Sequence, residues 1–419
     1  MTKNTLNGNF ILNLSPTNTM KKSILALAAI SIIGSEAAAQ IKSSQLSGQI
    51  NTVTTMVPFL GITPDSRMGG MGEAGVAAFD VDANSVFWNA ANLVNAKKKL
   101  QFGLSYQPWL AKLVKDVGLS YLSGYYKLSD RSAVGGSLRY FSLGDINFTD
   151  IAGNPDGNFR PQEFAIDGCY ALKFNKNLSM GVNLRYINSN LTGNRTSGNT
   201  ATSPGQSVAG DISLLYRKEV KISGKDALWQ FGTNIQNIGS KMTYTSRENR
   251  DFIPTNLKIG TALQYTIDDY QKVNFMFDIN KLLVPTRPYY LKGANGRDSL
   301  GSDGTPVIIG KDPNVSPLQG MVQSFTDAPG GFKEELNEIT YSFGAEYWYN
   351  EQFALRTGFF YEAATKGNRK YITTGIGIKY KTLQIDAAYL IPVVSQHPLA
   401  GQLRFSLLAS FDSSGGDKK

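Results

Sequence analysis

The chain has 419 residues, of which 42% are apolar and only 18% are charged, and its formal net charge is +9. An average soluble domain has about 25% charged residues. The low charge, together with 42 Gly, 22 Phe and 20 Tyr, is typical of a transmembrane β-barrel with aromatic girdles and argues against an ordinary soluble domain.

Lys and Arg are scattered along the chain rather than clustered, so the positive charge does not indicate nucleic-acid binding. A solvated surface is the main interpretation of this charge, and attraction to anionic lipid headgroups is the second. The single cysteine, Cys169, excludes an internal disulfide. It falls on the polar face of a predicted strand, where we interpret it as a small filler.

Residues 1–39 carry the features of a targeting segment. A basic start at Met20-Lys21-Lys22 precedes an apolar run, Ile24–Ile33, and small residues at Ala37–Ala39. The apolar run is too short for a membrane helix, so we predict a signal peptide that is removed before Gln40. Residues 1–19 are expected to be an upstream extension, with Met20 as the initiator.

Residues 40–99 are predicted to form a plug. Within them, Pro58–Leu93 is rich in Gly and Ala and lacks a strand pattern, which indicates compact irregular structure that something else must enclose. Asp80 and Asp82 resemble the start of a calcium loop, but the Gly and closing Glu are missing, so an Asx-stabilised turn is expected. Gly69–Gly75 lacks the Lys-Ser/Thr of a phosphate loop and suits tight packing inside a lumen.

Residues 100–411 alternate apolar and polar side chains with a period of two, which places the two sets on opposite faces of a sheet. Fourteen predicted strands are centred near Leu104, Leu119, Leu138, Ile166, Val182, Leu214, Phe231, Ile259, Phe275, Phe343, Leu355, Ile376, Ile385 and Phe405. An even number is what a bacterial outer-membrane barrel requires. The fold class predicted is all-β: a 14-stranded antiparallel transmembrane barrel with an N-terminal luminal plug.

The connections alternate between longer and shorter, beginning with residues 108–115 and then 129–131, and including a short connection at Glu219–Asp226. Short periplasmic turns and longer extracellular loops produce this rhythm in a membrane barrel, whereas a soluble β-sandwich has no reason to keep it. Leu403–Phe411 ends on an aromatic residue, as the closing strand of such barrels does. Residues 412–419 then form a polar tail, which departs from the common pattern of a terminal aromatic.

No catalytic constellation is evident. The only histidine, His397, lies two residues from Ser395 in a predicted loop, and no third member of a triad is apparent. No His/Cys cluster would hold a transition metal. We therefore expect no catalytic residues, no metal and no cofactor.

The connection Pro285–Glu338 is far longer than a routine loop, and such loops are usually functional or disordered. Its first half, Gly293–Gly304, is polar, and its second half is apolar. An apolar extracellular loop needs a partner or a fold of its own, so docking to another protein and capping of the barrel both stay open. The candidate partner-binding residues are Ile308, Ile309, Leu318, Met321 and Phe325.

The plug carries the most specific motif: Pro58-Phe59-Leu60, Pro64-Asp65-Ser66-Arg67, Gly69-Gly70-Met71-Gly72, Gly75-Val76-Ala77 and Trp88-Asn89-Ala90-Ala91. These residues resemble the hatch of FadL-type transporters and, more specifically, that of the PorV (LptO) family of the Bacteroidetes type IX secretion system. The motif residues are Pro64, Asp65, Arg67, Gly72, Gly75, Asp82, Trp88 and Asn89. Asn89-Ala90-Ala91 stands where the family commonly has Asn-Pro-Ala.

The resemblance implies a non-enzymatic protein of the Gram-negative outer membrane that serves protein secretion. By this analogy it accompanies the SprA/Sov translocon barrel, collects cargo bearing a conserved C-terminal domain, and delivers it to the PorU sortase complex. The alternative is a FadL-like transporter of hydrophobic small molecules. A shuttle should co-purify with secreted proteins, whereas a transporter should bind fatty acid or detergent in an apolar pocket.

The charged plug residues Asp65, Arg67, Glu73, Asp80 and Asp82 are expected to hold the plug in place rather than bind a ligand, because buried charges persist mainly when paired. The expected partners on the strands are Arg139, Arg185, Asp211 and Asp278.

Overall fold

The structure is a computed structural model that describes residues 46, 48–110, 114, 116–149, 152–193, 195–197, 200–246, 248–292, 297–301, 306–393 and 399–412. The predicted signal peptide, Ser395, His397 and most of the C-terminal tail lie outside these residues.

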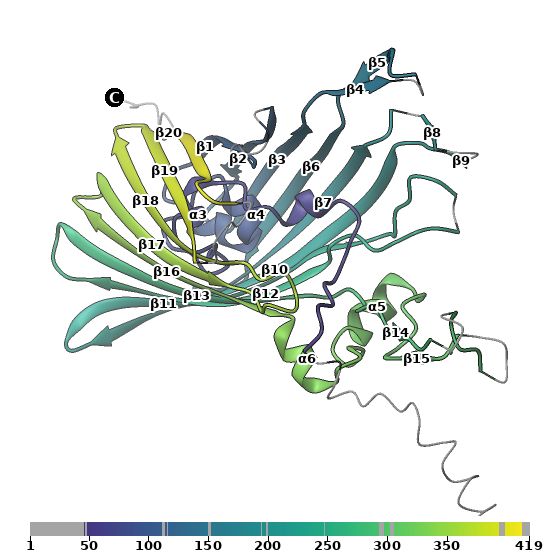
Figure 1. Ribbon diagram of the computed structural model, residues 1–419. Helices are drawn as coiled ribbons and strands as arrows, with labels where there is room; N and C mark the ends of the chain where they lie inside the picture. Colours follow the sequence, from purple (N-terminus) through teal and green to yellow (C-terminus); the bar gives the residue numbers. More distant parts are fainter. Residues whose placement is uncertain are drawn as a thin grey trace, which may run out of the picture.

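Fourteen strands form one closed barrel in which every neighbouring pair is antiparallel (Figure 1). They are β1 Leu100–Pro108, β2 Val117–Lys127, β3 Ser132–Leu143, β6 Gln162–Lys173, β7 Leu178–Asn190, β10 Gly205–Ile222, β11 Lys225–Gly239, β12 Asn256–Thr266, β13 Gln271–Leu282, β16 Ile339–Tyr349, β17 Phe353–Tyr361, β18 Lys370–Tyr380, β19 Leu383–Pro392 and β20 Leu403–Phe411. The last strand closes on the first, with Phe405 opposite Tyr106. The predicted strand number and closing strand are therefore confirmed.

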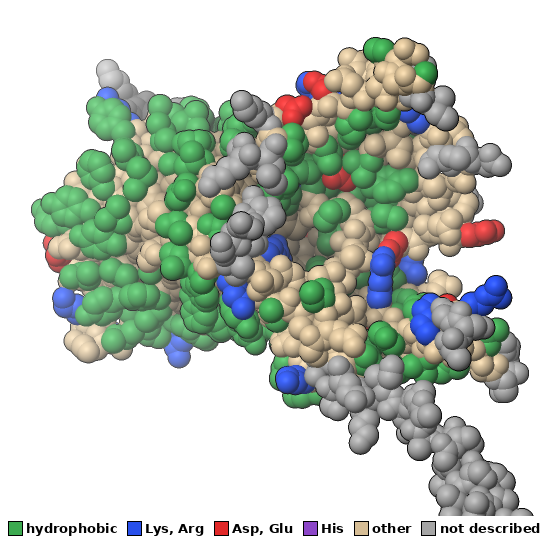
Figure 2. Space-filling model, viewed as in Figure 1, with side chains coloured by type: hydrophobic (Ala, Val, Ile, Leu, Met, Phe, Trp, Pro, Cys, Tyr) green, Lys and Arg blue, Asp and Glu red, His purple; other side chains and the backbone are tan. Residues whose placement is uncertain are grey.

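The alternation of side chains is confirmed as an inside-outside pattern. Large apolar residues point outward and stay exposed along the strands; Leu184, at the middle of β7, is 71% exposed. In Figure 2, apolar side chains cover the outer surface of the barrel wall. Inward positions carry buried polar residues such as Asn183 and Ser213. An apolar outer band around a polar interior is the arrangement of an outer-membrane barrel.

Long and short connections alternate as predicted, and the long ones gather at one end of the barrel, which is the extracellular end (Figure 1). The β10–β11 connection is shorter than predicted. It consists of Ser223 and Gly224, both with positive φ, rather than Glu219–Asp226. Two residues with positive φ suit the twist of a tight hairpin, so the strands continue into the polar stretch that the sequence suggested was a turn.

Residues 58–95 fold inside the barrel into four short elements (Figure 1). They are the 3-10 helices η1 Pro58–Gly61 and η2 Ala90–Asn95 and the α-helices α3 Ser66–Gly69 and α4 Ser85–Trp88. Nearly all residues from Thr63 to Leu93 are buried. The plug therefore supplies the core that the barrel wall encloses.

The extracellular loops carry small elements of their own: β4 Ile146–Thr149, β5 Pro155–Phe159, β8 Thr196–Ser197, β9 Thr200–Ala201, β14 Tyr289–Tyr290, β15 Ile308–Ile309, α5 Pro317–Gln323 and α6 Phe332–Asn337. The last four belong to the connection between β13 and β16, residues 283–338, which we call the outer loop. Among the described residues, no helix has the length and apolarity needed to cross a membrane.

A charge on the lipid-facing wall should destabilise the barrel. Leu184→Arg places a cation at the middle of a membrane strand, which costs about 2–4 kcal/mol. We expect this loss in the free energy of unfolding measured in lipid vesicles. Leu300→Arg is the matched control, since Leu300 is 63% exposed but lies in the outer loop. Equal effects of the two substitutions would contradict the placement of β7 in the membrane.

Candidate functional site: the plugged lumen and the extracellular face

Arg67 is the centre of the plug and is 1% exposed. Its guanidinium forms a two-pronged ion pair with Glu346 of β16, at 3.0 Å from Nε and 2.9 Å from Nη2. Nη1 donates to Asp82 at 3.2 Å and to the Asp80 carbonyl at 2.7 Å, and Nη2 donates to the Phe79 carbonyl at 2.9 Å. All N–H groups of the guanidinium are thus used, as burial of a charge requires.

Glu346 extends this pairing across the wall. It also accepts from Arg356 of β17 at 2.8 Å and from Asn274 of β13 at 2.9 Å. Arg356 in turn pairs with Asp386 of β19 at 2.7 Å. The plug is therefore joined to a chain of buried charges that spans several strands.

The other charged plug residues differ in their partners. Glu73 pairs with Arg404 of β20 at 2.8 Å, and Asp80 pairs with Lys272 of β13 at 2.8 Å. Among the described residues, the Asp82 carboxylate bonds only Arg67 and the Asn84 amide, both within the plug, contrary to expectation. Asp65 likewise bonds no described strand residue, contrary to expectation. Its carboxylate accepts from the Met68 amide at 2.9 Å and from Trp88 Nε1 at 2.7 Å, so it caps α3 and joins two parts of the plug.

Two of the four strand residues expected to contact the plug do so, through its backbone. Arg139 donates to the Leu60 carbonyl at 2.6 Å. Asp278 accepts from the Gly75 and Val76 amides at 2.7 and 2.9 Å.

The expectation for the other two, Arg185 and Asp211, was wrong. They pair with each other at 3.0 Å, and Arg185 also pairs with Asp167. Their positions on adjacent strands satisfy both charges without the plug.

The remaining motif residues shape the plug backbone. Pro64 is buried immediately before the capping residue Asp65. Asn89 caps η2 through a bond from the Ala91 amide at 3.1 Å, and it donates to the Val76 carbonyl at 2.8 Å. The Asn89 side-chain Nδ2 also donates to the Leu214 carbonyl of β10 at 3.1 Å, so Asn89 fixes the plug to the wall as well.

Glycines of the wall let the plug backbone approach closely. A Cβ on Gly344 would lie 2.6 Å from the Met71 carbonyl oxygen, and a Cβ on Gly358 would overlap the Gly72 backbone. Gly72 itself has φ of +64° and would press a side chain against the Phe343 carbonyl at 2.5 Å. Only glycine fits at these contacts. We call the wall positions the glycine seats of the plug: Gly181, Gly232, Gly260, Gly344, Gly358 and Gly375.

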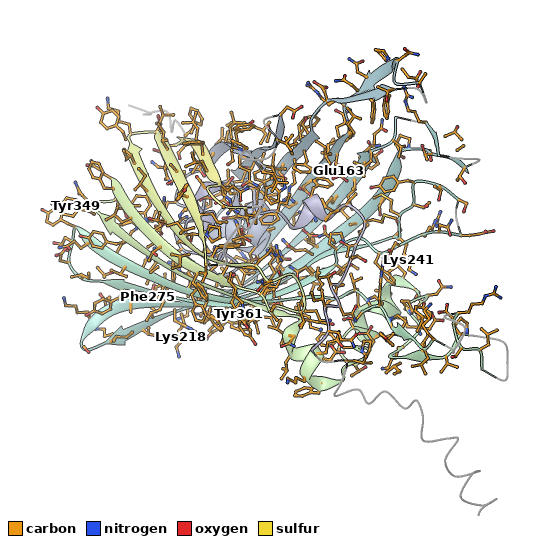
Figure 3. All side chains as sticks on the ribbon, viewed as in Figure 1. Glu163, Lys218, Lys241, Phe275, Tyr349 and Tyr361 are labelled. Carbon is orange, nitrogen blue, oxygen red and sulfur yellow. The ribbon has the colours of Figure 1, made fainter. Side chains whose placement is uncertain are left out.

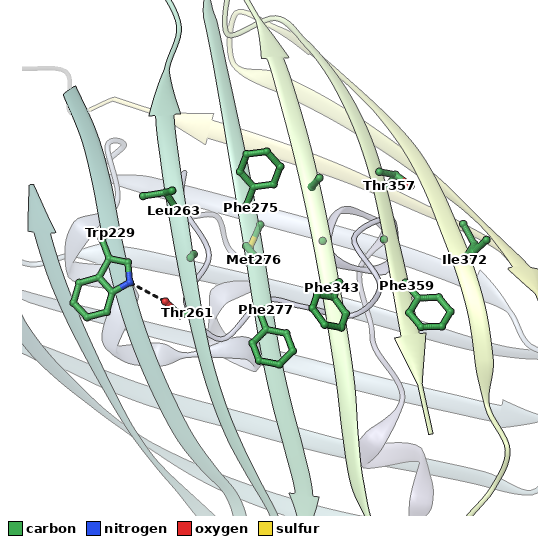
Figure 4. A pocket seen from close by; sticks show the side chains of 14 residues that line it. Trp229, Thr261, Leu263, Phe275, Met276, Phe277, Phe343, Thr357, Phe359 and Ile372 are labelled. Atoms are coloured by element: carbon green, nitrogen blue, oxygen red, sulfur yellow. Dashed lines mark hydrogen bonds between the residues drawn. The ribbon is translucent and has the colours of Figure 1, made fainter. Parts of the chain in front are cut away.

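Outside the same strands lies an apolar depression of about 790 Å³ in the barrel wall (Figure 4). The side chains of Phe275, Phe277, Phe343 and Phe359 border it. Its Thr261 hydroxyl is satisfied, because it accepts from Trp229 Nε1 at 2.9 Å. The lining therefore suits hydrocarbon, and the depression faces the membrane rather than the lumen.

The outer loop is held to the barrel rim by buried ion pairs. Glu338 accepts from Lys281 at 2.5 Å and from Lys366 at 2.9 Å. Lys281 also bonds Glu335 at 3.1 Å, and Lys366 bonds Glu334 at 2.6 Å. Residues 48–57 reach the same cluster from the lumen (Figure 1), where Asn51 donates to Glu334 at 3.0 Å.

Asp327 adds another acid to this cluster. Burial, together with the nearby Glu335 and Glu338, raises the pKa of Asp327 to about 7. Its folded-state pKa lies above the usual 3.8, so the folded loop binds a proton more tightly than the unfolded chain does. The contribution of Asp327 to stability is therefore present at acidic pH and is lost as the pH rises from about 4 to 7.

The candidate partner residues lie in two different environments. Leu318 is 66% exposed on α5, Phe325 is exposed just beyond it, and Met321 is half-buried. Ile308 and Ile309 are half-buried in the β14–β15 ladder, so they support the loop as well as lining its surface.

α5 rests on the barrel rim through Gly320, where a Cβ would lie 2.7 Å from the Phe252 ring. Its opposite face carries Val322, which is 76% exposed. The outer loop thus packs on its own barrel and presents an apolar face.

Sequence reasoning missed two exposed apolar residues of α6, Phe332 and Leu336. These two residues are four positions apart with acids between them, a spacing that predicts one apolar face on a helix.

The labelled side chains in Figure 3 mark the outer wall and the two ends of the barrel. Phe275 and Tyr361 lie along the outer wall, and Tyr349 lies near the end with short turns. Glu163 and Lys241 lie toward the end with long loops. Among the described residues, no group of His, Cys, Asp and Glu is arranged to hold a metal ion.

A model for the family described as "Type IX secretion system protein PorV" matches residues 45–289, more than half of the chain. The chain belongs to the PorV family. It is thus a type IX secretion component of the outer membrane. The family match covers the plug and the strands through β13, whereas most of the outer loop lies beyond it. No curated protein matches this PorV-family chain in sequence.

Three solved structures illustrate what the chain resembles. The Pseudomonas putida toluene transporter TodX is 12% identical, with a TM-score of 0.45 over 86% of this chain and 98% of TodX. A Pseudomonas aeruginosa FadL homologue is 13% identical, with a TM-score of 0.42 over 86% and 99% of the two chains. The CymD monoaromatic hydrocarbon channel is 14% identical, with a TM-score of 0.44 over 83% and 98%. At these identities and TM-scores, the ligands of these proteins are not attributed to this chain.

Removal of the Arg67 side chain should destabilise the barrel strongly. Arg67→Ala leaves Glu346 and Asp82 buried with lost partners, at a cost of about 3–5 kcal/mol. We expect the folded band of a heat-modifiability gel to convert at a lower temperature. Arg160→Ala, which breaks an exposed ion pair with Asp145, should change little. An unchanged Arg67→Ala protein would contradict the central role of Arg67.

The glycine seats give a second test of the plugged lumen. Gly358→Val should force the plug from the wall and destabilise the protein by about 1–3 kcal/mol or more, because a Cβ there overlaps the plug backbone. The control is Gly168→Val on the outward face of β6, where a Cβ would meet no atom within 4 Å. Thermal unfolding followed by circular dichroism would compare the two. Equal stability would mean that the plug can move away from this seat.

Proposed function

We propose that this PorV-family chain carries secreted cargo proteins at the outer surface and hands them to the attachment complex. The proposal rests on the contrast between the plug in the lumen and the outer loop at the extracellular end. The plug contacts the wall backbone to backbone, whereas the outer loop presents exposed Leu318 and Val322 on a helix that is fixed to the rim. Exposed apolar residues on a rigid element favour binding of a protein partner.

The partners proposed are those implied by the family resemblance: the SprA/Sov-type translocon barrel, cargo with a conserved C-terminal domain, and the PorU sortase complex. The α5 face is the proposed contact for cargo. Its apolar side chains would bury area against a folded domain, while the surrounding polar residues would remain solvated, as at a typical interface.

A FadL-like transporter of small hydrophobic molecules would need an apolar path through the lumen. The glycine seats and the Arg67 pairs oppose such a path unless the plug moves. The apolar depression of the wall opens toward lipid, so its position does not favour this alternative.

The test is a mild-detergent pull-down of the tagged chain from its native outer membrane, followed by mass spectrometry. We expect a very large barrel protein and secreted proteins that share a C-terminal domain. Val322→Asp should reduce recovery of the cargo because it places a charge in the apolar face. Gln319→Asp adds the same charge to an exposed polar position of α5 and should not reduce it.

A heat-modifiability gel would verify that both variants fold. Cargo recovery that is unaffected by Val322→Asp would place the contact elsewhere on the surface. Recovery of the barrel alone, with extractable fatty acid, would favour the transporter.

A further inference from the structure

α6 is amphipathic over its six residues, Phe332–Asn337. Glu334 and Glu335 are buried on one face, together with Glu338 just beyond the helix. Phe332 and Leu336, four residues apart, share the opposite face with the exposed Lys333. The usual arrangement is reversed, because here the charged face is the buried one.

The charged face is fixed by ion pairs to two lysines of the rim. Lys281 lies at the end of β13 and Lys366 in the connection between β17 and β18, on either side of the position where β16 begins. Glu338 bonds both lysines. Since these pairs turn the acids toward the rim, the apolar face must point away from the barrel.

The apolar face is highly exposed. Phe332 is 77% exposed and Leu336 is 46% exposed. Two neighbouring apolar side chains on one helix face form a patch, and exposed apolar patches mark interaction surfaces. α6 lies at the rim beside the barrel wall rather than at the tips of the loops (Figure 1).

The wall below α6 shows which surface that is. β16 begins at Ile339, two residues after α6 ends, and its Tyr341 and Phe343 point to lipid. Tyr341 lies between Phe277 and Tyr361, with ring centroids 6.5 and 6.2 Å away.

Lys370 places its ammonium 5.0 Å from the ring of Tyr361. Tyrosines and a lysine at the extracellular ends of the strands are typical of the membrane-water interface. The chain passes from Leu336 at the end of α6 to Tyr341 of this aromatic band within five residues.

We propose that α6 is an anchor in the outer leaflet of the membrane. Phe332 and Leu336 enter the boundary of the hydrocarbon region, and Lys333 extends to the headgroups. We take the partner to be a lipid surface and not a protein, because α6 leads directly into the lipid-facing band of β16. The anchor holds the outer loop at the membrane, so that α5 is presented close to the bilayer.

The experiment uses the full chain in phosphatidylcholine vesicles that contain nitroxide-labelled phosphatidylcholine. A fluorophore is attached at Phe332→Cys or Leu336→Cys; the native Cys169 is buried and stays unlabelled. The positive control is Leu184→Cys on the wall, and the negative control is Leu300→Cys in the outer loop. All four positions are exposed, so the variants should fold, and a heat-modifiability gel verifies this.

We expect the nitroxide lipid to quench the labels at positions 332 and 336 severalfold more than the label at 300, and to approach the quenching at 184. Quenching at 332 and 336 no greater than at 300 would overturn the proposal and leave the face to a protein partner. The quenching measurement does not depend on cargo recovery in the pull-down. A negative result for the anchor can therefore be distinguished from a negative result for the proposed function.

Discussion

The ion pair between Arg67 and Glu346 is the interaction on which the plugged barrel depends. Burial of a guanidinium and a carboxylate is costly, and the pair offsets that cost only because each group has its remaining hydrogen bonds satisfied. Glu346 also holds Arg356, which holds Asp386. Loss of one member therefore leaves several charges without partners, which makes the plug and this part of the wall interdependent.

The plug is also held by close contact between its backbone and the backbone of the wall. The plug could not bring its charges to the wall if side chains separated the two backbones. Glycines at the contact, such as Gly358 and Gly72, remove that separation. On the other side of the same strands, large aromatic residues face the membrane. These strands therefore present small residues to the plug and large apolar side chains to the lipid.

With the lumen occupied, the exposed chemistry lies at the extracellular end. Glu334, Glu335 and Glu338 hold α6 to the two rim lysines, whereas α5 packs on Phe252 through Gly320. With these contacts α5 exposes Leu318 and Val322, and α6 exposes Phe332 and Leu336 on the face opposite its acids. The outer loop thus presents two separate apolar surfaces.

The sequence by itself determined the barrel, because a period of two and a rhythm of long and short connections are local properties of the chain. It also indicated the enclosed plug, since Pro58–Leu93 has too much Gly and Ala to stand alone. It did not determine which charges meet. Arg67 and Glu346 are 279 positions apart, and only barrel closure and strand register bring them together. Arg185 and Asp211 pair across adjacent strands for the same reason. The outward face of α6 likewise follows from Lys281 and Lys366, which lie on separate strands and loops that only the tertiary structure places on either side of the helix.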